Sequence, residues 1–366
     1  MLTASYRADG SSVFGANHKW GYFPSAALAW KASEESFIKN LAVFSNLKLR
    51  GSWGKTGNQG IQPYQSLASV ASGLNYPLDG TGTANIGFQL GTAANPNLKW
   101  ETTAQTNLGI DLGFLDERIT ATVDVYKKKT TDLLMNQTLP NYTGFTSVLQ
   151  NVGSIENKGL EISVNAKPIV GHDFTWTTGA NISFNRDKIL ALANNNAALP
   201  IITNTGGGYN IFKSGAWALK QLRVGHPVDD FYGYINQGTW NTSEAATALT
   251  FGQLPGDAKW KDVNKDGTIN IAGDGNQVIG NAAPKFIYGW NNTFTYKNFD
   301  LTFLIQGSYG NDIFNAVRIK TEGPAVGTSA NLLNRWTSTN QNTPVPAFTS
   351  SQDRNSGLSG DRKSVV

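Results

Sequence analysis

The chain has 366 residues, of which 40% are hydrophobic and 15% charged, with a formal net charge of +4 and no cysteine. An aromatic content of 11% and this small net charge exclude a disordered chain and give no basis for nucleic-acid binding. The lack of cysteine excludes disulfides, thiolate metal sites and cysteine nucleophiles.

Three strands and one short helix are predicted in the first 55 residues. The strands span 1–8, 20–32 and 47–55. Between the second and third lies the segment SEESFIKNLAVFSN, which we interpret as a short helix capped by Ser33, because serine is a preferred N-cap residue.

The rest of the chain is dominated by alternation of apolar and polar residues, which is typical of strands with one apolar face. In QTNLGIDLGF, for example, Leu108, Ile110 and Leu112 oppose polar or small residues. Six such strands are predicted, at 98–114, 118–132, 152–166, 174–185, 285–296 and 299–310. They are longer than ordinary globular strands and suit tilted strands that cross a bilayer. Aromatic residues stand near their ends, as in the girdles of membrane barrels: Trp100, Phe114, Tyr126, Phe174, Tyr296 and Phe299.

The connections between the strands are of two kinds. The tight ones are Leu115–Glu117, Lys167–Asp173 and Lys297–Asn298, whereas the long polar ones are 56–97, 133–150, 186–284 and 311 onward. If successive strands alternate in direction, all long loops fall on one side and all tight turns on the other, as in outer-membrane barrels. No apolar run approaches the roughly 18 residues of a transmembrane helix. The predicted fold is therefore all-β: about ten strands of an antiparallel transmembrane β-barrel, with long extracellular loops. A sheet in lipid must close into a barrel. Ten strands could close, but the long loops and the strand lengths favour a larger barrel of which this chain is part.

Several segments resemble the SusC/RagA-type TonB-dependent receptors, in order and over nearly the whole chain. They include YRADGSSVFGANHKWGYFPSAALAWKASEESFIKN, LKLRGSWGKTGNQGIQPYQS, NPNLKWETTAQTNLGIDLGF, PGDAKWKDVNKDGTIN and PKFIYGWNNTFTYKNFDLTF. The resemblance implies a barrel of about 22 strands in the outer membrane of Bacteroidetes-type bacteria. It further implies import of glycans, oligosaccharides or peptides with a SusD-like lipoprotein, driven by TonB through a plug domain. On this basis we expect residues 1–350 to form part of the barrel and 351–366 an unassigned tail. The plug and the final strands would lie outside this chain, which would not transport alone.

The segment DVNKDGTIN spaces oxygen-bearing residues as a calcium loop does. The predicted ligands are Asp262, Asn264, Asp266, the Thr268 carbonyl, Asn270 and Asp274. Asp274 stands one residue late, because the twelfth position is Gly273. Two interpretations stay open: a calcium ion that stiffens an extracellular loop, or a turn rich in Asp and Asn that needs no metal.

Other candidate sites are weaker. No catalytic residues are predicted, since the doublets Glu34-Glu35 and Asp229-Asp230 would point to opposite faces of an extended chain. Six loop aromatics are candidates for stacking on sugar rings or, alternatively, for packing the loops: Tyr209, Trp217, Tyr232, Tyr234, Trp240 and Trp260. The rival hypothesis to the importer is a secreted, calcium-stabilised soluble β-domain that binds polysaccharide.

Overall fold

The computed structural model describes residues 1–15, 17–73, 75, 86–201, 219–270, 272–315, 317, 321 and 329–347. It divides into two compact units. The strand unit consists of Met1–Ala198, Arg223–Val228 and Lys285–Tyr309; the loop unit consists of Leu199–Leu222, Asp229–Pro284 and Gly310–Val366. The expected tail at 351–366 lies outside the described residues.

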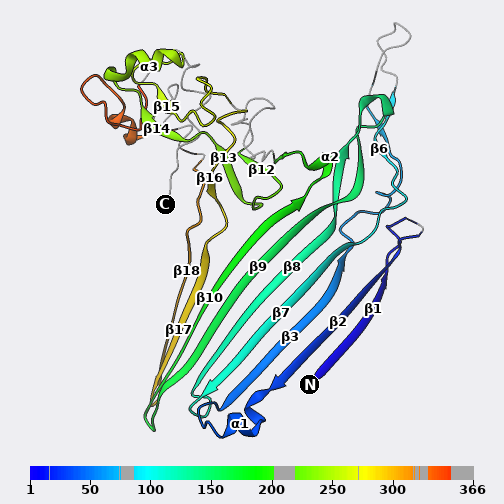
Figure 1. Cartoon of the computed structure of the whole chain (residues 1–366), viewed down its shortest axis with the longest axis vertical. Helices are drawn as coiled ribbons and strands as arrows, with labels where there is room; N and C mark the ends of the chain where they lie inside the picture. The colour runs from blue at the N-terminus through cyan, green and yellow to red at the C-terminus, as the bar shows by residue number, and fades with distance from the viewer. Residues whose placement is uncertain are drawn as a thin grey trace. The chain divides into compact units, whose positions relative to one another are not determined.

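The strand unit is built on one curved sheet of long strands that lie side by side (Figure 1). Its nine long strands are β1 (Leu2–Gly10), β2 (Trp20–Lys31), β3 (Asn46–Asn58), β7 (Glu101–Phe114), β8 (Ile119–Thr138), β9 (Ser147–Val170), β10 (Phe174–Ala191), β17 (Phe286–Tyr296) and β18 (Phe299–Tyr309). They are antiparallel and follow this same order in space, and the short β6 (Thr92–Ala93) adds a tenth strand, parallel to β9. Within the described residues the sheet does not close on itself, and β1 and β18 are its two edges.

The predicted apolar rows lie in register across the sheet. Leu108 pairs with Val125, Val125 with Leu160, and Leu160 with Phe184, so one apolar row crosses β7, β8, β9 and β10. A slip of one residue would move such a row to the other face. Leu108 is nevertheless 63% exposed and Val125 52% exposed. A continuous apolar face that stays exposed is the lipid-facing surface of a membrane barrel.

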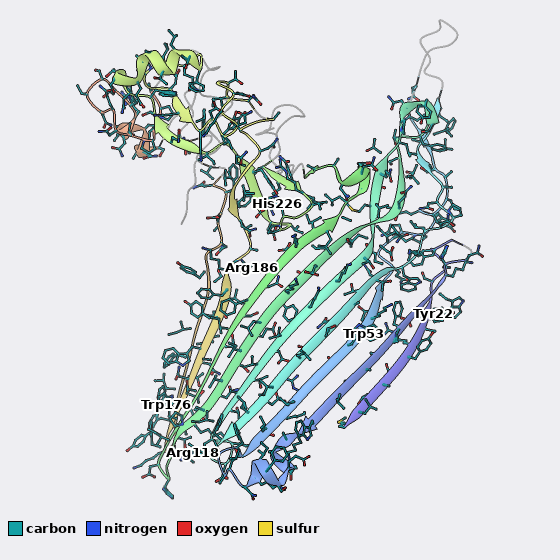
Figure 2. The ribbon with its side chains drawn as sticks, viewed as in Figure 1. Tyr22, Trp53, Arg118, Trp176, Arg186 and His226 are labelled. Atoms are coloured by element: carbon teal, nitrogen blue, oxygen red, sulfur yellow. The ribbon has the colours of Figure 1, made fainter. Side chains whose placement is uncertain are left out.

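The tight connections are confirmed at one end of the sheet. Four residues join β7 to β8, and Leu115, Asp116 and Glu117 among them have positive φ, which lets the chain reverse sharply. Arg118, which lies at this end in Figure 2, donates hydrogen bonds to the carbonyl oxygens of Lys167 and Pro168 and so joins this turn to the end of β9. The connection from β2 to β3 is longer and holds the 3-10 helix η1 (Ala32–Glu34) and α1 (Ser36–Lys39).

The connection from β8 to β9, at the other end, is shorter than the predicted loop 133–150. The two strands continue to pair as far as Thr138 and Ser147, which leaves only 139–146 between them, with the 3-10 helix η2 (Asn141–Thr143). The register shifts at Leu133, next to Asp132 with φ +60°. This bulge breaks the period of two, so the alternation in the sequence stops before the strand does.

Two smaller predictions are wrong. Ser33 does not cap the helix: it lies inside η1, where its side chain is buried, and α1 begins after Glu35 without a side-chain cap. Tyr126 does not belong to a girdle at a strand end, because β8 extends twelve residues beyond it to Thr138. Its hydroxyl instead donates to Asn185 Oδ1 at 3.0 Å, on the polar face of the sheet.

The remaining strands and helices are short. Those of the strand unit are β4 (Val70–Ser72), β5 (Phe88–Leu90) and α2 (Ala193–Asn196). The loop unit contains β11 (Leu199–Ile201), β12 (Lys220–Leu222), β13 (Asp230–Gly233) and β16 (Gln277–Asn281) in one sheet, β14 (Asn236–Thr239) and β15 (Ala258–Trp260) in another, and η3 (Thr242–Glu244), α3 (Ala245–Thr250) and η4 (Ala330–Asn334). Among the described residues, no helix is both long and apolar enough to span a bilayer.

Candidate functional site

A charged network crosses three strands on the polar face of the sheet. The Arg50 guanidinium of β3 donates to both carboxylate oxygens of Asp111 on β7, at 2.8 and 2.9 Å, and to Asp124 Oδ2 on β8 at 3.0 Å. Gly109 allows this bridge, since a Cβ there would lie 2.5 Å from Asp124 Oδ1. Asn107 Nδ2 donates to that same oxygen at 3.2 Å. The network holds its charged side chains in fixed positions on the face opposite the lipid.

A polar hollow of about 540 Å³ adjoins this network. Its lining is made of amide, hydroxyl and charged side chains: Arg50, Gln105, Asn107, Asp124, Tyr126, Lys128, Asn157, Glu161 and Asn185. Within the strand unit, polar solutes would therefore meet a hydrophilic wall on this face, while the opposite face is apolar.

Four of the aromatic residues predicted to bind a ligand form the interior of the loop unit. Tyr232 is fully buried, and Tyr234, Trp240 and Trp260 are 3–6% exposed. Tyr234 and Trp260 pack with Ala258 and Ile269 as a small core, with ring centroids 5.7 Å apart. This burial favours the packing role and leaves no open ring face for a sugar in this arrangement. Tyr209 and Trp217 lie outside the described residues.

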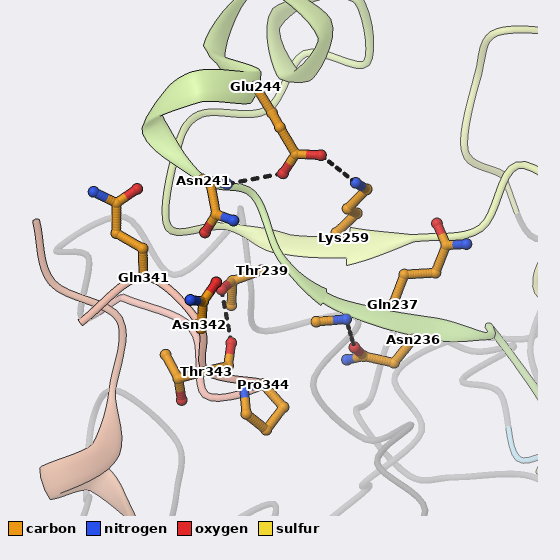
Figure 3. A pocket seen from close by; sticks show the side chains of 11 residues that line it. Asn236, Gln237, Thr239, Asn241, Glu244, Lys259, Gln341, Asn342, Thr343 and Pro344 are labelled. Carbon is orange, nitrogen blue, oxygen red and sulfur yellow. Dashed lines mark hydrogen bonds and ion pairs between the residues drawn. The ribbon is translucent and has the colours of Figure 1, made fainter.

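A second polar hollow, of about 650 Å³, lies in the loop unit (Figure 3). It opens between β14, the start of η3 and the segment 341–344, which lies about a hundred residues further along the chain. The lining residues are Asn236, Gln237, Gly238, Thr239, Asn241, Glu244, Lys259, Gln341, Asn342, Thr343 and Pro344. The two sides are tied together, because Thr239 Oγ1 donates to the Thr343 carbonyl oxygen at 2.7 Å.

The charges in this hollow neutralise each other. Lys259 pairs with Glu244 Oε1, and its Nζ lies 4.5 Å above the centroid of the Trp240 ring. The Lys259 ammonium and the Asn241 backbone N–H lower the pKa of Glu244 below its ordinary value, so this carboxylate stays ionised at neutral pH. The remaining lining residues are uncharged: side-chain amides and threonines, together with Gly238 and Pro344.

The predicted calcium ligands fold into a compact loop. Asp262 accepts hydrogen bonds from the backbone N–H groups of Lys265 and Gly267, at 2.6 and 2.9 Å. Asp266 Oδ1 accepts from the Thr268 hydroxyl and N–H, at 2.7 and 2.8 Å, and these bonds hold the pKa of Asp266 below its ordinary value. The Asp266 carboxylate is thus favoured in its ionised form, as a calcium ligand must be.

The end of this loop is held by a buried carboxylate. Asp274 is fully buried and accepts hydrogen bonds from the backbone N–H groups of Val263 and Asn270, at 2.7 and 3.0 Å, so it joins the two ends of the loop. Gly273 lies against the loop, since a Cβ there would come 2.6 Å from Asn264 Nδ2 and 3.4 Å from Asn270 Oδ1. In the described part of the chain, no group of three or more His, Cys, Asp and Glu side chains gathers as a metal site. A metal here would therefore depend on amide and carbonyl oxygens as well as carboxylates.

The residues of the hollow in the loop unit were not singled out from the sequence. They come from NQGT at 236–239 and QNTP at 341–344, two loop segments that each combine adjacent amides with a threonine. This repeated pair of amides was the only sign of the hollow in the sequence that we identify. It indicates a site only because the two segments lie next to each other in the structure.

The comparisons with known proteins agree with this architecture. The family model described as TonB dependent receptor-like, beta-barrel matches residues 1–256. TonB-dependent receptor P3 of Formosa agariphila is 37% identical over 349 residues, which cover 94% of this chain and 34% of that protein. TonB-dependent receptor SusC of Bacteroides thetaiotaomicron is 35% identical over 330 residues, covering 88% and 31%. The chain thus spans about a third of the length of the curated relatives it matches.

The solved structures show the same fold. The structure of the RagAB peptide transporter matches with a TM-score of 0.76 at 27% identity, over 98% of this chain and 37% of that one. The RagAB peptide importer in its "open-open" state matches with a TM-score of 0.77, again at 27% identity, over 98% of this chain and 36% of that one.

Proposed function

The chain belongs to the TonB-dependent receptor family, as a member of the SusC/RagA type in the outer membrane, and from this premise we propose that it forms part of the wall of an importer for oligosaccharides or peptides. The observation that carries the proposal is the pair of opposite faces on one sheet. Apolar rows remain exposed on one face, and the Arg50–Asp111–Asp124 network and a polar hollow lie on the other. A wall of this kind separates lipid from a hydrophilic path.

We propose that the importer works with a SusD-like surface lipoprotein and takes its energy from TonB through a plug domain. Support comes from the sequence similarity to SusC and from the structural similarity to the RagAB peptide transporter. The rival hypothesis of a secreted soluble domain is not favoured, because a soluble protein rarely leaves so large an apolar face uncovered.

We also propose a structural calcium ion in the loop 262–274. The alternate oxygen-bearing residues, the lowered pKa of Asp266 and the close approach that Gly273 permits fit such an ion. When bound, the calcium ion would hold the oxygen atoms of the loop together through its positive charge. Asp274 would continue to hold the loop's two ends through its backbone hydrogen bonds.

The test is uptake by cells that carry the whole receptor gene. Labelled neutral oligosaccharides and labelled peptides are offered to wild-type cells, to cells lacking the receptor, and to cells lacking TonB. We expect one of the two substrate classes to enter only when both the receptor and TonB are present. Equal uptake by all three strains, for both classes, would refute the importer function.

A further inference from the structure

We propose that the hollow between β14 and 341–344 in the loop unit is a binding site for a neutral oligosaccharide. The inference rests on the proposed import function and assigns it a substrate class and a place. The volume of about 650 Å³ is within the range of small-ligand sites, which is roughly 300–1,000 Å³.

The chemistry of the lining selects a neutral, hydroxyl-rich ligand. Five lining side chains are amides, a group with both donors and an acceptor: Asn236, Gln237, Asn241, Gln341 and Asn342. Gln341 already bonds Thr242 and Ser338, and Asn236 Oδ1 accepts from the Gly238 N–H, so the amides of Gln237 and Asn342 are the ones most open to a ligand. Sugar hydroxyls are also donors and acceptors at once, so amides pair with them in either sense. The two charged residues of the lining already neutralise each other, which leaves little to attract an ionic ligand.

The floor of the hollow is held rigid before any ligand arrives. Thr239 and Thr343, both 7% exposed, are linked by the bond from Thr239 Oγ1 to the Thr343 carbonyl, and the Thr343 hydroxyl donates to the Asn334 carbonyl at 2.6 Å. A further hydrogen bond, from the Ala347 N–H to the Gly256 carbonyl at 2.8 Å, holds the chain just after the segment 341–344. A site that is already ordered loses less entropy when a ligand binds.

The rim carries amides that are free to bind. Gln237 and Asn342 are exposed, and within the described residues their side chains make no hydrogen bond. Gln237 precedes Gly238, whose φ is +104°, at an irregularity where β14 and β15 shift register between Asn236 and Thr239. Bulges of this kind change the direction of a side chain and recur beside binding sites. The free amides thus stand where a ligand would enter.

The experiment uses the full-length receptor in detergent and a defined panel of probes. The panel holds uncharged hexasaccharides (α-glucan, β-glucan, mannan and xylan) and uncharged hexapeptides, with binding measured by titration calorimetry. The double variant Gln237→Ala/Asn342→Ala removes two exposed amides without touching the floor. Thr247→Ala, on the exposed face of α3, is the matched control.

We expect at least one hexasaccharide to bind, and the double variant to weaken that binding about tenfold, the effect of losing two neutral hydrogen bonds. Thr247→Ala should bind as wild type does. Absence of hexasaccharide binding at millimolar concentration, or equal affinity in the double variant, overturns the proposal. So does binding of the hexapeptides that depends on Gln237 and Asn342. TonB-dependent uptake of peptides alone would overturn the saccharide site while leaving the import function intact.

Discussion

The indole of Trp176 donates a hydrogen bond to Asn292 Oδ1 over 3.1 Å, from β10 to the neighbouring β17. Trp176 lies close to the tight-turn end of its strand (Figure 2). Asn292 belongs to an otherwise apolar row of β17, between Trp290 and Phe294, yet it is only 1% exposed. The Trp176 ring stacks on Phe294 with centroids 5.7 Å apart, and this packing covers the amide. The amide oxygen of this polar side chain on the lipid face is thus provided with a donor, while its Nδ2 is buried without a hydrogen-bond partner.

Trp176→Phe should therefore destabilise the barrel by about 1 kcal/mol, because it leaves a buried amide oxygen without its donor. Trp290→Phe is the matched control: its indole donates to Thr178 Oγ1 at 2.9 Å, but Trp290 is 42% exposed and the Thr178 hydroxyl keeps a second partner, the Asn291 carbonyl. The unfolding midpoint of the whole receptor in guanidinium measures both. A larger loss in Trp290→Phe than in Trp176→Phe would contradict this account of the buried pair.

Two glycines on neighbouring strands should differ in how much stability they lose when replaced by alanine. At Gly109 a Cβ would lie 2.5 Å from Asp124 Oδ1 and 2.7 Å from Arg50 Cζ, so Gly109→Ala must displace the charged network, at a cost of about 1–3 kcal/mol. At Gly51 the nearest atom would be Leu108 Cδ2 at 3.5 Å, an ordinary contact, so Gly51→Ala should change stability by less than about 0.5 kcal/mol. Thermal unfolding of the two variants gives the comparison, and equal effects would show that the Arg50 bridge does not need the space at Gly109.

The sequence was sufficient for the strands and their faces because their pattern is local. In QTNLGIDLGF every second residue reports which side of the sheet it faces, and pairing with β8 only has to keep that order. The ends of the strands were harder to predict from the sequence. Beyond Asp132 the bulge reverses the parity of the alternation, and β8 and β9 go on pairing through contacts that no single segment encodes.

The sites in the loops were harder still to predict, because they are formed by residues that are far apart in the sequence. Tyr234 and Trp260 are residue types that can stack on sugars. Only their packing against each other in the structure shows that they form a core. The hollow beside them needs Thr239 and Thr343, which are far apart in sequence, to meet. The oxygen spacing from Asp262 to Asn270 was readable because those residues are neighbours along the chain.

The connection between β2 and β3 should lose a stabilising charge interaction in acid. Hydrogen bonds from Lys39 and Lys31 lower the pKa of Glu34 from its ordinary value of 4.5 to about 2. A carboxylate with a depressed pKa stabilises the fold above its unfolded pKa, and that contribution is lost as the pH falls from about 4.5 through about 2. Lys39→Met should raise the pKa of Glu34, as read from its carboxyl ¹³C chemical shift. Lys167→Met, at the same end of the sheet, should leave it unchanged; an equal shift in both variants would point to a general field effect.

Removal of calcium should affect the loop 262–274 and can be followed through Trp260, two residues before Asp262. Terbium bound in place of calcium would be excited by this indole, so the full receptor should show sensitised emission that calcium displaces at about 10⁻⁴–10⁻³ M, the range of extracellular sites. Asp262→Ala/Asp266→Ala removes two of the predicted carboxylate ligands and should abolish the emission. Lys265→Ala changes the charge of the same loop without removing a predicted ligand, and should retain the emission. Emission that persists in the double variant, or that ten millimolar calcium fails to displace, would leave the loop as a metal-free turn held by Asp274.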